Sequence, residues 1–269
     1  MENIIEEISK TVLGVEHEYL KDGLLHCCKC NRATQVEVEF MNKKKVVRCI
    51  CDCRKKELEE FEERKKFEER ERRRSICFSE NHIKSYTFDK DDKNDMRLSN
   101  AMIKYVENFD DFKKSGEGLL LYGNVGTGKT FYTACIANKL IDEGYHVLLT
   151  SFSKIVNELQ GMFKGKQEYM DSLNQYSLLI LDDLGIERHT EYMQEHIYNI
   201  VDSRYRTGLP FIITTNLTLN ELKNPQDLSY ARIYDRILER CFPIMMNGVS
   251  RRRETIKDNY FSTKQKLGL

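Results

Sequence analysis

A glycine-rich motif constrains the fold of this chain more than any other feature. Residues 123–130 read Gly-Asn-Val-Gly-Thr-Gly-Lys-Thr and fit the pattern G-x-x-x-x-G-K-[ST] at every fixed position. An apolar run at 119–122 precedes the motif and helical spacing follows at 131–140, so the strand, loop and helix that the motif requires are all predicted. In such a loop the glycines let backbone N–H groups surround an anion, and the helix N-terminus adds positive charge. The sequence therefore predicts a phosphate cradle.

The residues of this cradle have distinct expected roles. Lys129 is expected to reach the outer phosphates of a nucleotide, and the Thr130 hydroxyl is expected to hold Mg²⁺. The rest of the loop is expected to contact the phosphates mainly through its backbone: Gly123, Asn124, Val125, Gly126, Thr127 and Gly128.

Two carboxylates follow a second apolar run. Residues 178–181 are Leu-Leu-Ile-Leu, and Asp182 and Asp183 come directly after them. Consecutive apolar residues are typical of a parallel strand that is buried on both faces. Ligands of open α/β sheets bind at the carboxyl ends of such strands. We therefore expect Asp182 to complete the Mg²⁺ shell and Asp183 to orient the attacking water or accept its proton.

The same reading extends to a complete α/β domain. Further strands are predicted at 145–150, 211–216 and 242–246. Helices with apolar stripes are predicted at 96–109, 152–163, 193–206 and 230–241. Strands that alternate with helices favour a parallel sheet with helices on both faces. The predicted fold is therefore a parallel five-stranded sheet flanked by helices.

Cysteines are concentrated before this domain. Six of the nine lie between residues 27 and 53, in the clusters Cys-Cys-Lys-Cys at 27–30 and Cys-Ile-Cys-Asp-Cys at 49–53. This density favours a metal site in a reducing compartment over a disulfide framework. Two close cysteine pairs supply the four thiolates that tetrahedral zinc requires. Between them, residues 34–40 and 46–47 alternate like the strands of a hairpin, which is typical of a zinc ribbon.

The predicted zinc ligands are Cys27, Cys30, Cys51 and Cys53, with Cys49, Cys28 and His26 as alternatives. A segment of about 35 residues has too small a core to fold without a metal or disulfide cross-link. The isolated cysteines are expected to be inert thiols: Cys77, Cys135 and Cys241.

A charged segment separates the cysteines from the α/β domain. Residues 54–74 contain ten basic and eight acidic side chains. Opposite charges at i,i+4 spacing support a solvated helix. We therefore predict an N-terminal helix plus zinc-binding module at 1–53, a charged helical linker at 54–82 and the α/β domain at 83–269.

The N-terminus is predicted to form a short amphipathic helix at 2–13. Its apolar stripe either docks on the zinc module or faces a partner: Ile4, Ile5, Ile8 and Val12. The first residues are acidic where a secretory signal would be basic. Because no apolar run approaches the ~18 residues of a membrane span, we expect a soluble, cytoplasmic protein without a membrane partner.

The overall charge is balanced. Lys plus Arg and Asp plus Glu both total 43, so no global positive field indicates a nucleic-acid partner. Residues 228–269 hold nine basic and four acidic side chains, a local positive region that could meet single-stranded DNA.

Taken together, these motifs resemble an AAA+ ATPase, and more closely the bacterial and phage helicase loaders of the DnaC/DnaI type. The runs that carry the resemblance lie at 178–185, 204–206, 214–217 and 232–237. The related IstB transposition ATPases share much of this pattern. The resemblance covers about residues 83–260, and the cysteine module is similar to the zinc-binding region of phage-type DnaC-like proteins.

The resemblance implies roles for individual residues. Lys129 and Thr130 match the ATP and magnesium residues, and Asp182 and Asp183 match the Walker B pair. The commonest AAA+ pattern has glutamate where Asp183 stands. Asn216 matches sensor 1, which reads the γ-phosphate.

Three arginines are also carried over. Arg236 matches the arginine finger that reaches the ATP of a neighbouring subunit, with Arg232 as second choice. Arg252, in Gly-x-Ser-x-Arg, matches sensor 2. A finger supplied by another subunit can change the rate by about 10³ to 10⁵, so we expect slow turnover in the monomer.

The function implied is that of an ATP-dependent loader. Such a protein places a replicative hexameric helicase of the DnaB type on single-stranded DNA, as an ATP-dependent homo-oligomer, with residues 1–75 as the expected helicase contact. Alternatives are an IstB-like transposition helper, a P-loop kinase acting on a small molecule, and a nucleotide-binding zinc adaptor without hydrolysis.

Overall fold

The computed structural model describes residues 17–40, 42–185, 190–248, 250, 260 and 263–267. The chain divides into two units, one ending at Glu69 and the other starting at Arg70. The predicted helix at 2–13 and the predicted role of Arg252 fall outside the described residues. Within the described residues, no helix combines the length and apolar character that a membrane span needs.

The first unit contains two antiparallel hairpins followed by a long helix. Strand β1 (Glu18–Lys21) pairs with β2 (Leu24–Cys27), and β3 (Gln35–Phe40) pairs with β4 (Lys43–Arg48). The β3–β4 hairpin confirms the sequence prediction. The β1–β2 hairpin is an addition to it, although its Asp22-Gly23 turn, with φ values of 52° and 82°, carries a strong hairpin signal.

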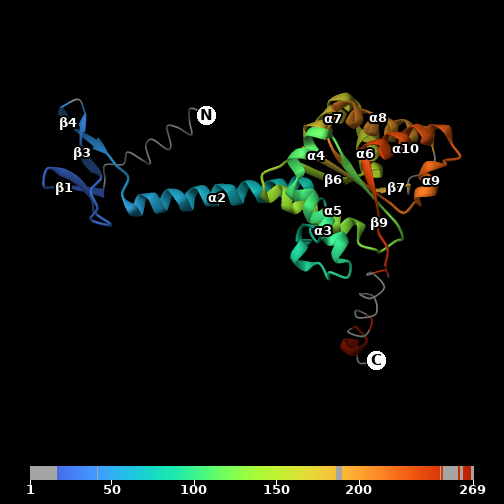
Figure 1. Cartoon of the computed structure of the whole chain (residues 1–269), viewed down its shortest axis with the longest axis horizontal. Helices are drawn as coiled ribbons and strands as arrows, with labels where there is room; N and C mark the ends of the chain where they lie inside the picture. The colour runs from blue at the N-terminus through green and yellow to red at the C-terminus, as the bar shows by residue number, and fades with distance from the viewer. Residues whose placement is uncertain are drawn as a thin grey trace. The chain divides into compact units, whose positions relative to one another are not determined.

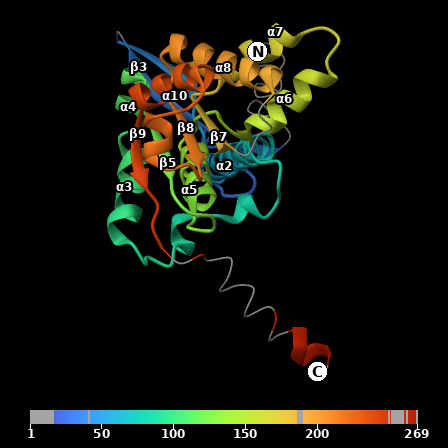
Figure 2. The ribbon, with the colours of Figure 1, turned by 90° about the vertical axis from the view of Figure 1, so that its right-hand side faces the viewer.

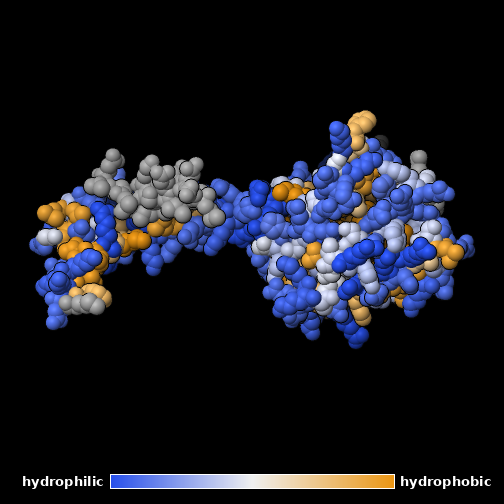
Figure 3. Space-filling model, turned by 90° about the horizontal axis from the view of Figure 1, so that it is seen from above, coloured by the Kyte–Doolittle hydropathy of each residue, from blue (hydrophilic) through white to orange (hydrophobic). Residues whose placement is uncertain are grey.

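Hydrophobic side chains are visible on the surface of the first unit (Figure 3). Those on the β3–β4 hairpin include Val36, Val38, Phe40 and Val46. A two-stranded ribbon has no second layer of its own, so both of its faces meet solvent. Among the described residues up to Glu69, the buried ones are Cys27, Thr34 and Cys51. This part of the chain therefore has almost no apolar core.

Helix α2 (Asp52–Cys77) confirms that the charged segment is helical. Its last residues belong to the second unit, because Cys77 and Phe78 are buried in the core there. Arg74 anchors this end by donating from Nε to Asn138 Oδ1 at 3.1 Å. The three-part division at 53/54 and 82/83 stays a prediction about which segments fold independently.

The second unit is built on one sheet. Its strands are β5 (Gly118–Tyr122), β6 (Val147–Ser151), β7 (Leu178–Leu184), β8 (Phe211–Thr215) and β9 (Cys241–Met245). They lie in the order β6-β7-β8-β5-β9, and every neighbouring pair is parallel. The predicted parallel five-stranded sheet is confirmed.

Helices flank this sheet (Figure 1). They are α3 (Met96–Glu107), α4 (Phe109–Ser115), α5 (Lys129–Asp142), α6 (Phe152–Gly161), α7 (Lys166–Ser172), α8 (Glu191–Thr207), α9 (Leu219–Lys223) and α10 (Leu228–Arg240). Several begin at a side-chain cap: Ser151 accepts from Lys154 N at 3.2 Å and Thr190 from Met193 N at 3.3 Å. Such caps stabilise a helix by about 1 kcal/mol each.

The alternation of strand residues divides the core into two layers. Leu119, Leu121 and Ile180 pack with α3 and α5, whereas Leu120 and Leu179 pack with α6, α8 and α10. Successive side chains of a strand point to opposite faces, so a continuous apolar run serves both layers. Figure 2 shows α5 on one side of the sheet and α8 and α10 on the other.

The strand order brings together the chain segments that follow three neighbouring strands. Strand β8 lies between β7 and β5, and all three run in the same direction. Their carboxyl ends therefore meet, and these ends carry the phosphate loop, the two aspartates and Asn216.

Candidate nucleotide and metal sites

The predicted phosphate loop connects β5 to α5. Gly123, Gly126 and Gly128 have φ values of 139°, 84° and 95°, which favour glycine. No side chain caps the N-terminus of α5. The N-cap residue is Gly128, which has no side chain that could cap the helix, so an anion can bind at this N-terminus. The Thr127 hydroxyl donates to Asn124 O at 2.9 Å and closes the loop.

Lys129 is the buried cation of the loop, with 6% of its surface exposed. Its Nζ lies 2.8 Å from each of three oxygens: Gly123 O, Asn124 O and Asn216 Oδ1. The structure thus brings together Lys129, at the start of α5, and Asn216, which directly follows β8. A phosphate oxygen can replace one of these acceptors, because an ammonium group has three donors.

Thr130 and Asp182 also meet at this edge. The Thr130 hydroxyl donates to Asp182 Oδ2 at 2.9 Å, and the Thr214 hydroxyl donates to Asp182 Oδ1. Burial raises the pKa of Asp182 above its ordinary value, and the hydrogen bond from Thr214 opposes this shift. A hydroxyl beside a carboxylate is an oxygen donor set that fits Mg²⁺, and the ion would favour the charged carboxylate.

Asp183 occupies an irregular position at the end of β7. Its φ is 62°, and the pairing of β7 with β8 shifts register between Leu181 and Leu184. A non-glycine residue in this region of φ is uncommon and costs about 1–2 kcal/mol. The backbone N–H of Asp183 donates to Thr214 Oγ1 at 2.9 Å, and the side chain is exposed. This bulge presents the Asp183 carboxylate to solvent beside the partly buried Asp182.

The predicted arginines of α10 lie apart from these contacts. Arg236 forms an ion pair with Asp202 of α8 at 2.7 Å. Arg232 is exposed and lines a cavity of about 770 Å³ between α8, α9 and α10.

The chain beyond β9 returns to the phosphate loop. A Cβ atom added to Gly123 would lie 2.3 Å from Met246 O, and one added to Gly126 would lie 2.1 Å from Ser250 Oγ. Ser250 is the serine of the Gly-x-Ser-x-Arg run. The chain from Met246 to Ser250, which begins this motif, therefore reaches the phosphate loop.

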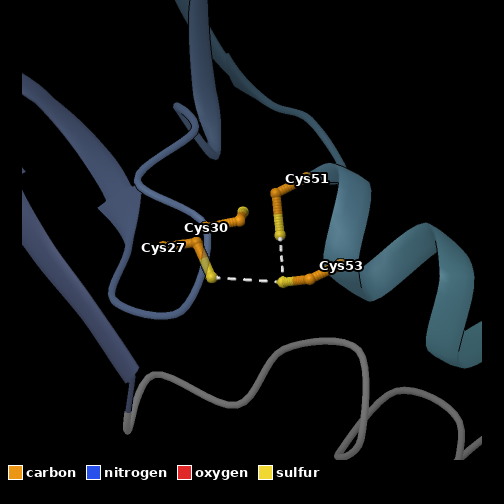
Figure 4. A group of neighbouring side chains, drawn as sticks. All are labelled: Cys27, Cys30, Cys51 and Cys53. Carbon is orange, nitrogen blue, oxygen red and sulfur yellow. Dashed lines mark hydrogen bonds between the residues drawn. The ribbon is translucent and has the colours of Figure 1, made fainter.

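The four predicted zinc ligands gather in the first unit (Figure 4). The Sγ atoms of Cys27, Cys30, Cys51 and Cys53 all lie within 4.8 Å of one another. Two separations are 3.5 Å for Cys27 to Cys53 and 3.4 Å for Cys51 to Cys53. Tetrahedral zinc with Zn–S bonds of about 2.3 Å places sulfurs about 3.8 Å apart, so the four thiols fit a metal ion.

The alternative ligands lie outside this group. Cys28 is exposed, and Cys49 Sγ donates to Ala33 O at 3.4 Å. His26 Nδ1 lies 3.1 Å from Leu24 O. When cysteine, histidine, aspartate and glutamate are all considered as ligands, the tetrad formed by the four predicted cysteines is the one group among the described residues that lies close enough together to hold a metal ion.

The electrostatics of the tetrad favour a bound cation. A hydrogen bond from the backbone at Arg32 lowers the pKa of Cys30 to about 6. The hydrogen bond with Cys51 raises the pKa of Cys53. Thiolates this close cannot all be charged together without a cation, because like charges disfavour ionisation.

Two site residues were not predicted from the sequence. Thr214 joins Asp182 to the backbone of Asp183, and Asp202 pairs with Arg236. Thr214 could have been found from the Thr-Thr-Asn run at 214–216, because a threonine at the end of a buried strand places a hydroxyl at the carboxyl end of the sheet. Asp202 is one of several charged residues on a helix, and no sequence pattern distinguishes it.

Comparison with known proteins places this geometry in a family. A family model described as "IstB-like ATP binding protein" matches residues 32–259. The chain belongs to this family. The IstB-like chain is thus an ATP-binding P-loop protein, in agreement with the phosphate loop and the Lys129 contacts described above.

Two curated relatives connect the family to different processes. The chain is 31% identical over 170 residues to the replicative helicase loader DnaI of Bacillus subtilis, covering 56% of this chain and 54% of DnaI. It is 27% identical over 143 residues to an ATP-binding protein in an insertion sequence of Mycobacterium tuberculosis, covering 51% of this chain and 57% of that protein. The IstB-like chain spans about half the length of each of these relatives.

Solved structures support the same fold. A crystal structure of DnaI matches with a TM-score of 0.56 and 27% identity, covering 67% of this chain and 99% of that chain. AMPPCP-bound DnaA from Aquifex aeolicus matches with a TM-score of 0.50 and 20% identity, covering 69% of this chain and 56% of that chain, which shows the fold alone. The AAA+ architecture expected from the sequence motifs is therefore confirmed, and the chain resembles helicase loaders as well as IstB-like proteins.

Proposed function

We propose that this chain is an ATP-dependent loader that places a replicative hexameric helicase on single-stranded DNA in the cytoplasm. The observation that carries the proposal is the similarity to DnaI, which includes 31% identity to the curated protein and nearly the whole of the DnaI crystal structure. The nucleotide-site residues up to Asn216 lie within residues 32–259, which the family model matches.

In this function the chain binds ATP with Mg²⁺ and hydrolyses it. Lys129 would exchange an internal acceptor for the outer phosphates, and Thr130 with Asp182 would hold the metal. The exposed Asp183 would orient the attacking water, while Asn216 would read the γ-phosphate through its link to Lys129. Arg252 would contact the nucleotide from the segment after Ser250.

The site is proposed to be completed by a second copy of the chain. Arg236 is the first candidate for the residue supplied in trans, and exposed Arg232 is the second. Supply of an arginine across an interface makes hydrolysis depend on assembly, because the lone subunit lacks one source of charge stabilisation.

We also propose that the second unit binds single-stranded DNA. The side chain of Phe163, between α6 and α7, is fully exposed, and Lys164 and Lys166 lie beside it in the sequence. An exposed aromatic ring with neighbouring cations can stack on a base while the cations contact phosphates. This arrangement supports a DNA contact at the α6–α7 connection.

The first unit is proposed to bind the helicase and to hold one structural Zn²⁺. Its four cysteines fit a zinc ion, and its exposed hairpin offers apolar surface for a protein contact.

A pull-down with the full-length chain tests the proposal. A hexameric DnaB-type helicase should be retained in the presence of ATP, and retention should fall when the Cys27→Ser, Cys30→Ser double variant is used. A second arm compares wild type with Phe163→Ala for binding of labelled single-stranded DNA, with exposed Phe67→Ala as the matched control. Absence of helicase binding while ATP and DNA binding remain intact would remove the loader function.

A transposition helper is the second candidate function. The insertion-sequence relative from Mycobacterium tuberculosis favours it, at 27% identity. In that case the same ATP-dependent pull-down should retain a transposase and no replicative helicase.

A further inference from the structure

The arginine proposed to act on another subunit is held within its own chain. Arg236 Nη2 lies 2.7 Å from Asp202 Oδ1, with 23% and 14% of the two side chains exposed. The guanidinium carbon lies 4.6 Å from the ring centre of Tyr198 and 5.7 Å from that of Tyr205. Arg236 is therefore held between α8 and α10 by one carboxylate and two aromatic rings.

Asp202 is shared between two arginines. Its other oxygen, Oδ2, lies 2.8 Å from Arg206 Nε, and the Arg206 side chain is 73% exposed. Oδ1 is buried and has no well-aligned hydrogen-bond donor, although Arg236 Nη2 is only 2.7 Å away. The contact with Arg236 therefore depends on charge and ring stacking and lacks the two aligned hydrogen bonds of a bidentate pair.

Such a contact can be exchanged for another anion. A guanidinium binds phosphate oxygens as well as carboxylates, and a nucleotide polyphosphate carries more charge than one carboxylate. If Arg236 moved to a phosphate, Asp202 would still be paired with Arg206. No isolated charge would then remain at this largely buried carboxylate. The two-arginine arrangement therefore lowers the cost of releasing Arg236.

We propose that Asp202 is a latch that holds Arg236 in its own subunit until the polyphosphate of a nucleotide bound to an adjacent copy replaces it. The latch rests on the proposed function, in which Arg236 completes a neighbouring site. Asp202 is a positioning residue in this scheme, since it acts only through Arg236. Its effect is to raise the protein concentration at which assembly and hydrolysis begin.

The test measures ATP hydrolysis by the full-length chain as a function of protein concentration. Asp202→Asn keeps the shape of the side chain and removes its charge. The concentration for half-maximal turnover should fall by about twofold to fivefold, the range expected for loss of one partly exposed ion pair. Sedimentation with ATP should show assembly at correspondingly lower concentration. Asp111→Asn is the matched control, because its ion pair with Lys114 is on the surface, with 81% and 78% of the side chains exposed.

Two further variants make the result decisive. Tyr198→Leu removes the nearer ring from Arg236 and should shift the midpoint in the same direction by a smaller factor. Asp202→Glu retains the charge and should lie closer to wild type than Asp202→Asn. A merely structural role for Asp202 would weaken assembly, so an unchanged or higher midpoint in Asp202→Asn and in Tyr198→Leu overturns the latch.

Failure of the proposed function has a different signature. Arg236→Ala should abolish the concentration-dependent part of hydrolysis in both the wild-type and the Asp202→Asn backgrounds. If wild-type hydrolysis is independent of concentration and Arg236→Ala has no effect, the completion of the site in trans is wrong and the latch falls with it. If both behave as expected and only the midpoint shift is absent, the latch alone is wrong.

Discussion

The nucleotide site and the cysteine tetrad differ in what holds their residues in place. The nucleotide site stands at the edge of a sheet whose strands are buried on both faces, with Leu120, Leu121 and Ile180 fully inaccessible. Removing this apolar surface from water contributes about 25 cal/mol per Å². The positions of Lys129 and Asp182 therefore follow from a core that exists without any ligand.

The cysteine tetrad has no comparable support. In the described part of the first unit, the buried residues are two of the ligands themselves, Cys27 and Cys51, together with Thr34. A structural Zn²⁺ contributes about 10–16 kcal/mol of apparent binding free energy in zinc-finger peptides at pH 7. A metal can thus replace the missing core, so its loss should affect structure, whereas a change in the nucleotide site should affect chemistry.

The largest effect is expected from removing the metal. The purified chain should contain about one Zn²⁺, because four thiolates complete one tetrahedral site. Chelation, or the Cys27→Ser, Cys30→Ser double substitution, should unfold the β1–β4 region, as measured by metal analysis and limited proteolysis. Cys28→Ser is the matched control, since Cys28 is exposed and outside the tetrad. Unchanged metal content in the double variant would contradict the assignment.

Lys129→Ala should impair the nucleotide site without unfolding the second unit. The substitution removes the cation that now contacts Gly123 O, Asn124 O and Asn216 Oδ1. ATP affinity should fall by at least about 100-fold, since a charged hydrogen-bonding group at the phosphates is lost. Lys139→Ala, on the exposed face of the same helix, is the control. Binding isotherms and thermal melts measure the two effects separately, and loss of folding in Lys129→Ala would break the contrast with the tetrad.

The smallest of these effects is expected from Thr214→Val. The valine keeps the shape but loses the hydroxyl that contacts Asp182 and the Asp183 backbone, which costs about 1–3 kcal/mol in hydrogen bonding. Hydrolysis should fall by roughly 10-fold, corresponding to about 1.4 kcal/mol in the barrier. Thr215→Val removes a similar pair of bonds, to Leu184 O and Leu217 N, and should destabilise the fold without this loss of rate. Equal rates in the two variants would show that Thr214 has no special role.

Local patterns determined the elements and most of the chemistry. The motif at 123–130, the apolar run before Asp182 and Asp183, and the two cysteine clusters were sufficient to predict the parallel sheet, the phosphate loop and a four-cysteine group. These predictions succeed because glycine conformations, strand burial and ligand spacing are set within short stretches of chain.

Only the tertiary structure showed which of several chemically similar residues take part in each site. Cluster spacing allowed Cys49 or Cys28 as ligands, and the packing of the β2 turn against the start of α2 gathers Cys27, Cys30, Cys51 and Cys53 instead. Sequence likewise placed Arg236 on a helix but could not show that Asp202, on another helix, holds it. The physical reason is that spacing fixes which side chains share a turn or a strand, whereas partners on different elements are decided by how those elements pack.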